Sequence, residues 1–116
     1  MKVYCYDRCS TCRKALSWLD GRGIDYLKID IKTEHPDVET LRAYVKTSGL
    51  PLKRFFNTSG GVYREMGLGQ RLKDMPEEEQ LALLASDGML VKRPLAVGDD
   101  FVLVGFREEE WAAKVP

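Results

Sequence analysis

Apolar and polar positions alternate in the first part of the chain in the order expected for a strand, a helix and a second strand. Residues 2–6 form a short apolar run typical of a strand, and apolar residues recur at helical spacing over 15–19 before a glycine-containing turn at 21–23. Apolar positions alternate with polar ones again over residues 24–31. This order predicts a βαβ unit, in which a right-handed crossover joins two parallel strands.

Residues 35–86 change to a helical pattern that is broken by turn residues and contains no convincing strand. One helix is predicted between Pro36 and Gly49, and another begins at Pro76. The Asn-Thr-Ser-Gly-Gly loop at residues 57–61 has the glycines and hydroxyls of a phosphate cradle, but it lacks the Gly-Lys-Ser/Thr ending of a P-loop. We therefore interpret this loop as a plain turn.

Strand-like runs return near the C-terminus. They cover residues 89–91, 95–97 and 101–106, and the Gly-Asp-Asp turn at 98–100 makes an antiparallel hairpin of the last two. Three glutamates at residues 108–110 then begin a final helix, since acidic residues favour the positive end of a helix.

The length of 116 residues suits one domain with one main core. We expect a single domain over residues 1–116 of the α/β class. Its mixed four-stranded sheet should carry a helical insertion, at approximately residues 35–86, between the second and third strands.

Charge and hydropathy argue against several classes of protein. Eighteen basic and eighteen acidic residues cancel, so no net positive field draws the chain to nucleic acid or to an anionic membrane. No segment reaches the roughly 20 apolar residues that span a bilayer, and Met1 and Lys2 lead into a strand rather than into a signal peptide. We expect a cytoplasmic protein with no direct contact to nucleic acid or membrane.

The candidate chemistry lies at Cys9 and Cys12, a C-x-x-C between the first strand and the first helix. Cys9 would sit just outside the helix N-terminus, where free backbone N–H groups and the helix dipole favour a thiolate. Cys12 would lie about one turn further on, shielded by packing. Cys9 is therefore the candidate nucleophile and Cys12 the candidate resolving thiol, as in thioredoxin-like redox motifs.

The cysteine pair allows two other interpretations. A zinc site would need more ligands, but the chain offers only Cys5 and His35 besides the pair. The pair could also consist of two incidental thiols. In a reducing compartment, three cysteines fit a catalytic pair and one spare, so we expect Cys5 to be a buried apolar thiol. His35 is interpreted as a surface or helix-start residue rather than a catalytic base.

Three motifs occur together in the chain. They are C-x-x-C-R-K-A at residues 9–15, F-F-N-T-S-G at 55–60, and the S-D-G turn at 86–88 followed by M-L-V-K-R-P-L at 89–95. Together they resemble the ArsC/Spx family, and most of all its short Spx/MgsR-like proteins related to arsenate reductases. The resemblance covers nearly the whole chain and implies a thioredoxin-like fold.

The resemblance implies roles residue by residue. Cys9 matches the nucleophilic cysteine of the family, and Arg93 matches the arginine that precedes a cis-proline and helps to hold an oxyanion and stabilise the thiolate. Arg93 could instead be a solvated or purely structural arginine that caps a helix or pairs with Asp87. The residues expected to support the site are Ser10, Thr11, Arg13 and Pro94.

The chain also departs from the pattern of arsenate reductases of this class. Two further arginines of those enzymes fall at Asn57 and Gly105, which cannot bind an oxyanion through a guanidinium group. Arg54 or Arg107 could replace them from shifted positions. Cys12 is present as in Spx-type proteins, which favours internal disulfide chemistry.

Three functions follow from these observations as hypotheses. The first is a thiol–disulfide oxidoreductase, with no bound metal or cofactor, that draws electrons from glutathione, glutaredoxin or a thioredoxin-type protein. The second is a glutathione/glutaredoxin-dependent arsenate reductase, which we expect to be weak because of Asn57 and Gly105. The third is a redox-switched regulator that binds the α-subunit of RNA polymerase, although the longer charged tail of Spx proteins is not seen after Pro116.

Overall fold

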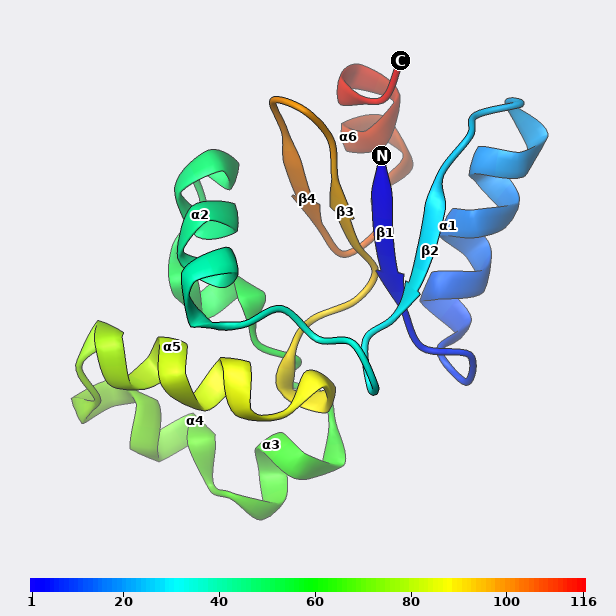
Figure 1. The fold of residues 1–116 in the computed structure, drawn as a ribbon. Coiled ribbons are helices and arrows are strands. Elements are labelled where there is room, and N and C mark those ends of the chain that lie inside the picture. The colour runs from blue at the N-terminus through cyan, green and yellow to red at the C-terminus, as the bar shows by residue number, and fades with distance from the viewer.

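The computed structural model describes all 116 residues and contains one mixed four-stranded sheet (Figure 1). The strands are β1 (Lys2–Cys5), β2 (Leu27–Asp30), β3 (Leu95–Val97) and β4 (Val102–Val104), in the spatial order β2-β1-β3-β4. β1 pairs with β2 in parallel and with β3 antiparallel, and β3 and β4 form an antiparallel hairpin. The predicted α/β class, the βαβ unit and the C-terminal hairpin are confirmed.

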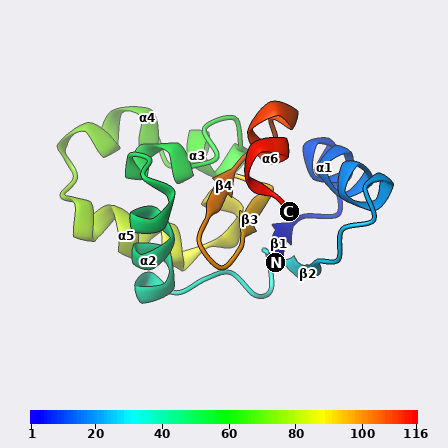
Figure 2. The same ribbon diagram turned by 90° about the horizontal axis from the view of Figure 1, so that it is seen from above.

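The alternation of side chains along β1 decides which helices cover each face of the sheet. Val3 and Cys5 belong to a core formed with α1 (Ser10–Gly21) and α6 (Glu108–Lys114), whereas Tyr4 belongs to a second core formed with the insertion. Figures 1 and 2 show α1 and α6 beside the sheet, and α2 (Val38–Ser48), α4 (Leu68–Arg71) and α5 (Glu77–Ser86) gathered on the other side.

The insertion between β2 and β3 is built from short helices. In chain order they are α2 (Val38–Ser48), the 3-10 turn η1 (Leu52–Phe55), α3 (Gly61–Glu65), α4 (Leu68–Arg71), the 3-10 turn η2 (Leu72–Asp74), α5 (Glu77–Ser86) and the 3-10 turn η3 (Gly88–Leu90). The limits predicted for the first helix of the insertion are close to those of α2. Asp37 caps α2 by accepting the N–H of Thr40 at 2.8 Å, and Gly49, in the left-handed conformation, ends it. None of the helices in the protein combines the length and the apolar content needed to cross a membrane.

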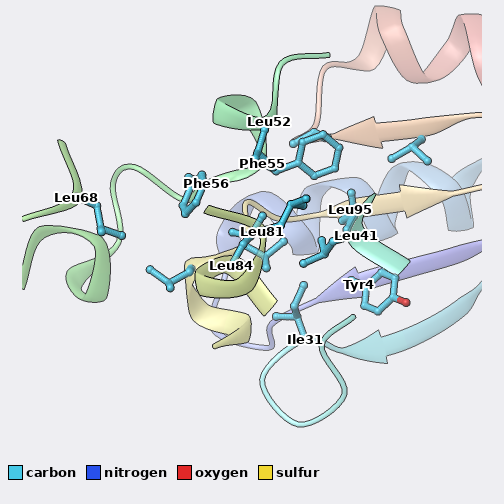
Figure 3. Close-up of a cluster of buried hydrophobic side chains, with 14 residues drawn as sticks. Tyr4, Ile31, Leu41, Leu52, Phe55, Phe56, Leu68, Leu81, Leu84 and Leu95 are labelled. Atoms are coloured by element: carbon cyan, nitrogen blue, oxygen red, sulfur yellow. The ribbon is translucent and has the colours of Figure 1, made fainter. Parts of the chain in front are cut away.

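A cluster of buried apolar side chains holds the insertion against the sheet (Figure 3). Leu41 of α2 and Leu84 of α5 lie in this cluster with Tyr4 of β1 and Leu95 of β3, and Phe55 of η1 is fully buried there. Complete burial of one such side chain is favourable by about 1.5–3 kcal/mol. The cluster therefore fixes η1 relative to the sheet, which matters because the residues next to Phe55 contribute to the candidate site.

Residues 89–91 do not form the predicted strand. The Asp87 carboxylate accepts the N–H of Met89 at 2.9 Å and turns the chain into η3. Only Val91 pairs in a β manner, through an isolated bridge to Phe56 of the insertion. This apolar run is buried between elements far apart in sequence, and such burial cannot be told from that of a strand by hydrophobicity alone.

The last strand is shorter than the predicted 101–106. β4 ends at Val104 because Gly105 has φ of +75°, a left-handed conformation that breaks the extended backbone. The N–H of Gly105 then donates to the carbonyl of Pro94 at 2.9 Å. This turn directs the chain after β4 towards the start of α1.

Candidate active site around Cys9

Cys9 occupies the N-cap position of α1, directly after the turn that leaves β1. Its backbone N–H donates to the carbonyl of Tyr6 at 3.0 Å, and its Sγ accepts the backbone N–H of Cys12 at 3.4 Å. The sulfur therefore faces the free N–H groups and the positive end of the helix dipole, both of which favour negative charge. The residue is only partly buried, so this sulfur is accessible to a reaction partner.

Cys12 lies in the first turn of α1 and is 1% exposed. A hydrogen bond with the Cys5 thiol and burial raise the pKa of Cys12, so it is a neutral thiol at neutral pH. A neutral, shielded thiol is a poor first attacker, but it lies one helical turn from Cys9. The two cysteines thus differ in the way expected for an attacking and a resolving thiol.

Cys9 lines a cavity of about 570 Å³ that is rich in positive charge. Five cationic side chains line this cavity and no carboxylate does: Arg8, Arg54, Lys92, Arg93 and Arg107. None of them is in an ion pair, because the salt bridges of the protein involve only Lys28 and Arg42 among the cations. The cavity therefore carries uncompensated positive charge beside the sulfur and is suited to an anionic ligand.

Arg93 reaches the cavity from the segment before β3. Its guanidinium donates through one terminal nitrogen to the carbonyl of Met89 at 3.3 Å and lies 5.3 Å from the ring centre of Tyr6, a cation–π arrangement. The proposed pairing with Asp87 is not observed, since the Asp87 carboxylate caps η3 instead. The Arg93–Pro94 peptide bond is cis, as the resemblance implied.

Two arginines that the sequence offered as substitutes lie in the same cavity. Arg54 comes from η1, Arg107 comes from the residue that precedes α6, and both line the cavity with Cys9. Asn57 and Gly105, which stand where the resemblance expects arginines, line it as well. The chain therefore has no arginine at the two positions that the resemblance implies, but the guanidinium groups of Arg54 and Arg107 are present in the same cavity.

Lys92 is a cavity residue that sequence reasoning missed. Its Cε lies 3.1 Å from the position that a Cβ on Gly105 would occupy, so the glycine leaves room for the lysine side chain. The sequence signal was its place immediately before Arg93 in the M-L-V-K-R-P-L motif, but a motif does not reveal which way a side chain points.

The predicted supporting residues fall into two groups. Ser10 and Thr11 line the cavity with Cys9, whereas Arg13 and Pro94 do not. Arg13 lies on a different side of the cysteine pair, where its guanidinium donates to the carbonyl of Asp7 at 3.1 Å. Its contribution to the site is therefore to hold the turn before Cys9 rather than to contact a ligand.

The loop at residues 57–61, predicted to be a plain turn, is closed by a hydrogen bond from the N–H of Gly60 to the carbonyl of Asn57 at 3.1 Å. Ser59 and Gly60 nevertheless line the cavity, so this turn forms part of its wall. His35 does not line the cavity. It was expected at the surface or at a helix start, but it is half-buried and its Nδ1 atom is enclosed.

Comparison with known proteins identifies the family. The sequence profile of the ArsC family matches residues 4–114 of the chain. The chain belongs to the ArsC family. Within this family it is 51% identical to the uncharacterized protein YusI of Bacillus subtilis, over 96% of this chain and 94% of YusI.

Two further relatives of this ArsC family member carry functional names. The chain is 45% identical to a possible arsenate reductase from Streptococcus mutans, whose crystal structure superposes with a TM-score of 0.87 over 96% of each chain. It is also 26% identical to the global transcriptional regulator Spx of Enterococcus faecalis, over 95% of this chain and 82% of Spx. The thioredoxin-like fold that the resemblance implied is confirmed by the structural match.

Proposed function

We propose that this protein is a thiol–disulfide redox protein in which Cys9 is the nucleophile and Cys12 the resolving thiol. The observation that carries the proposal is the position of the Cys9 sulfur, which caps α1 and lines a cavity with five cationic and no acidic side chains. The buried Cys12 lies directly behind it in the first turn of the same helix.

The reaction follows from this asymmetry. The Cys9 thiolate attacks one sulfur of a disulfide substrate, forms a mixed disulfide and releases the other half of the substrate as a thiolate. Cys12 then loses its proton and attacks the Cys9 sulfur, which releases the second thiolate and leaves a Cys9–Cys12 disulfide. Arg93 and the N-terminus of α1 stabilise negative charge on sulfur during both steps.

The reductant that returns the pair to the dithiol is proposed to be glutathione, directly or through a glutaredoxin or thioredoxin-type protein. Glutathione carries two carboxylates, and cationic side chains such as Arg54, Lys92 and Arg107 can pair with them. The cavity of about 570 Å³ is also within the usual range of small-molecule sites, about 300–1,000 Å³.

A second candidate function is arsenate reduction, and the presence of Arg54 and Arg107 in the cavity favours it. An arsenate oxyanion needs several convergent cationic hydrogen-bond donors around the attacked atom. The sequence argument against this activity was the loss of arginines at Asn57 and Gly105, and the two arginines in the cavity weaken that argument. The cysteine that would form the arsenate adduct is again Cys9.

A regulatory role like that of the Spx relative is an alternative outcome of the same chemistry. Oxidation of the Cys9–Cys12 pair would then switch binding to a protein partner, for which the α-subunit of RNA polymerase is the candidate. The balanced charge of the chain suits a protein partner better than DNA. Capture of the polymerase subunit by the oxidised or the reduced form alone would support this role.

Turnover and trapping of intermediates test the main proposal. The wild-type protein should reduce hydroxyethyl disulfide with glutathione as electron donor, and Cys9→Ser should abolish this activity. Without glutathione, Cys12→Ser treated with hydroxyethyl disulfide should accumulate a mixed disulfide on Cys9 that intact-mass spectrometry detects, because the resolving thiol is missing. Turnover that survives Cys9→Ser would refute the assignment, and efficient arsenate turnover with little disulfide reduction would favour the second candidate.

A further inference from the structure

The third cysteine lies next to the redox pair rather than apart from it. Cys5, the last residue of β1, is 1% exposed and belongs to the same buried cluster as Cys12. All three cysteines are free thiols. Sequence reasoning treated Cys5 as a spare core residue, but the fold brings the end of β1 against the first turn of α1.

The Cys12 thiol interacts with both of the other thiols. It contacts the Cys5 thiol, with which it shares a buried cluster, and the Cys9 thiol, and the backbone nitrogen of Cys12 is 3.4 Å from the Cys9 Sγ. Thiol–disulfide exchange proceeds by attack of one sulfur on a second sulfur while a third sulfur leaves. Because Cys12 has both other thiols as neighbours, it can exchange one of them for the other in a disulfide.

The buried pair of thiols also has a cavity of its own. Cys5 and Cys12 line a cavity of about 230 Å³ together with Lys28, and Cys9 does not line it. Arg13 lines this cavity as well, and Lys28 forms an exposed ion pair with Asp7 at 2.9 Å. The hydrogen bond from Cys12 and, to a lesser degree, the charge of Lys28 lower the pKa of the Cys5 thiol despite its burial.

We propose that Cys5 is a third redox residue that takes over the disulfide formed by the catalytic pair. The proposal rests on the proposed function, because the Cys9–Cys12 disulfide must form first. The Cys5 sulfur attacks the Cys12 sulfur, so that the Cys5–Cys12 bond forms and the Cys9–Cys12 bond breaks. The proton of Cys5 passes to the departing Cys9 sulfur or to water, and no electrons enter or leave the protein in this step.

The exchange would change what the oxidised protein presents to its surroundings. The Cys5–Cys12 disulfide is enclosed in the core, whereas Cys9 returns to the free state at the N-terminus of α1. The Cys5–Cys12 disulfide is then shielded from external thiols, and the Cys9 thiol is again free to react in the cationic cavity. The oxidised protein can therefore bind a second thiol-reactive partner through Cys9.

The positions of basic residues allow a direct test by peptide mapping. Trypsin cleaves after Lys2, Arg8 and Arg13, so peptide 3–8 carries Cys5 and peptide 9–13 carries both Cys9 and Cys12. Reduced wild-type protein is treated with hydroxyethyl disulfide, freed of it, and labelled with N-ethylmaleimide while folded. It is then denatured and labelled with an isotopically heavy maleimide before digestion.

The relay predicts that peptide 3–8 is joined to peptide 9–13 by a disulfide, with the light label on Cys9. Labelling of released Cys9 draws the exchange forward, so even a minor Cys5–Cys12 population accumulates. A disulfide that stays within peptide 9–13, with the heavy label on Cys5, would overturn the relay and leave the proposed function intact. The absence of any disulfide would contradict the proposed function itself.

Two variants separate the relay from direct oxidation. Cys5→Ala should keep the Cys9–Cys12 disulfide and should lose both the joined peptide and the light label. Cys9→Ser should form no joined peptide at a comparable rate, because the buried thiols depend on Cys9 for oxidation. Equally fast joining in Cys9→Ser would show that the buried pair reacts by itself and would overturn the relay. The wild-type result stands even if Cys5→Ala folds poorly.

Discussion

Replacement of Arg54 and Arg107 by glutamine should slow the reaction of Cys9 with an anionic disulfide much more than its reaction with a neutral one. Both arginines line the cavity that contains Cys9, and both are exposed to solvent. Glutamine keeps a polar side chain of similar reach and removes the charge. The double variant therefore isolates the contribution of positive charge to substrate binding and attack.

The exposure of the two arginines sets the size of the effect. Two unit charges about 4 Å apart interact by about 1 kcal/mol in bulk water and by about 4 kcal/mol at an effective dielectric constant of about 20. Because Arg54 and Arg107 are solvated, the lower value applies to each contact. Loss of both contacts then costs about 2 kcal/mol, which corresponds to about a thirtyfold lower rate constant.

The measurement is the ratio of two initial rates, one with oxidised glutathione and one with hydroxyethyl disulfide. The ratio cancels changes in the intrinsic reactivity of Cys9, since the same thiol attacks both substrates. Arg71→Gln is the matched control, because Arg71 is an exposed arginine of α4 that does not line the cavity. Higher salt should lower the wild-type ratio and leave that of the double variant nearly unchanged.

Three outcomes would refute this reasoning. Two unchanged rates in the double variant would mean that the cavity does not select anionic disulfides. Equal slowing with both disulfides, which also leaves the ratio unchanged, would mean that Arg54 and Arg107 act on Cys9 or on folding rather than on the substrate. A comparable fall of the ratio in Arg71→Gln would mean that total charge, and not the cavity, decides the rate.

Three further predictions concern reactivity and stability. Cys9 should react with iodoacetamide faster than the two other thiols, which are 1% exposed, and comparable rates in single-cysteine variants would contradict its assignment as nucleophile. Gly88→Ala should lower the free energy of unfolding in urea by about 1–3 kcal/mol because its Cβ would collide with the carbonyl oxygen of Ile31, whereas Gly21→Ala meets open space and should change it by less than about 1 kcal/mol. Burial and the hydrogen bond to Tyr44 at 3.0 Å raise the pKa of Tyr4, so the unfolded chain loses this proton first as the pH rises. Stability should therefore fall by up to about 1.4 kcal/mol per pH unit above about pH 10, and Tyr4→Phe should lack this component; an identical slope in both proteins would contradict the argument.

Features that depend on residues close together in the chain could be predicted from the amino-acid sequence. The strand, the turn and the start of α1 follow from the pattern around Cys9, so the sulfur at the helix N-terminus and the shielded Cys12 could both be anticipated. The caps of α2 were anticipated for the same reason, since Asp37 and Gly49 act on adjacent backbone groups. Hydrogen bonds between neighbours in sequence do not require knowledge of the rest of the chain.

Tertiary packing decided the features that depend on residues far apart in sequence. The apolar run at residues 89–91 resembled a strand, yet its burial arises from contact with Phe56 and the insertion, which hydrophobicity cannot distinguish from burial in a sheet. The sequence offered Arg54 and Arg107 only as possible substitutes and did not single out Lys92. These three residues meet beside Cys9 because η1, the segment before β3 and the turn after β4 come together there.

Cys5 shows the same limit most clearly. Its alternation in β1 predicted burial, and it is buried, but the pattern could not name the residue that it would meet. The packing of α1 on the sheet brings Cys12 against it and so turns a spare core thiol into a neighbour of the redox pair. Periodicity determines which face of an element is buried, whereas the contacts made by that face depend on how the elements pack in three dimensions.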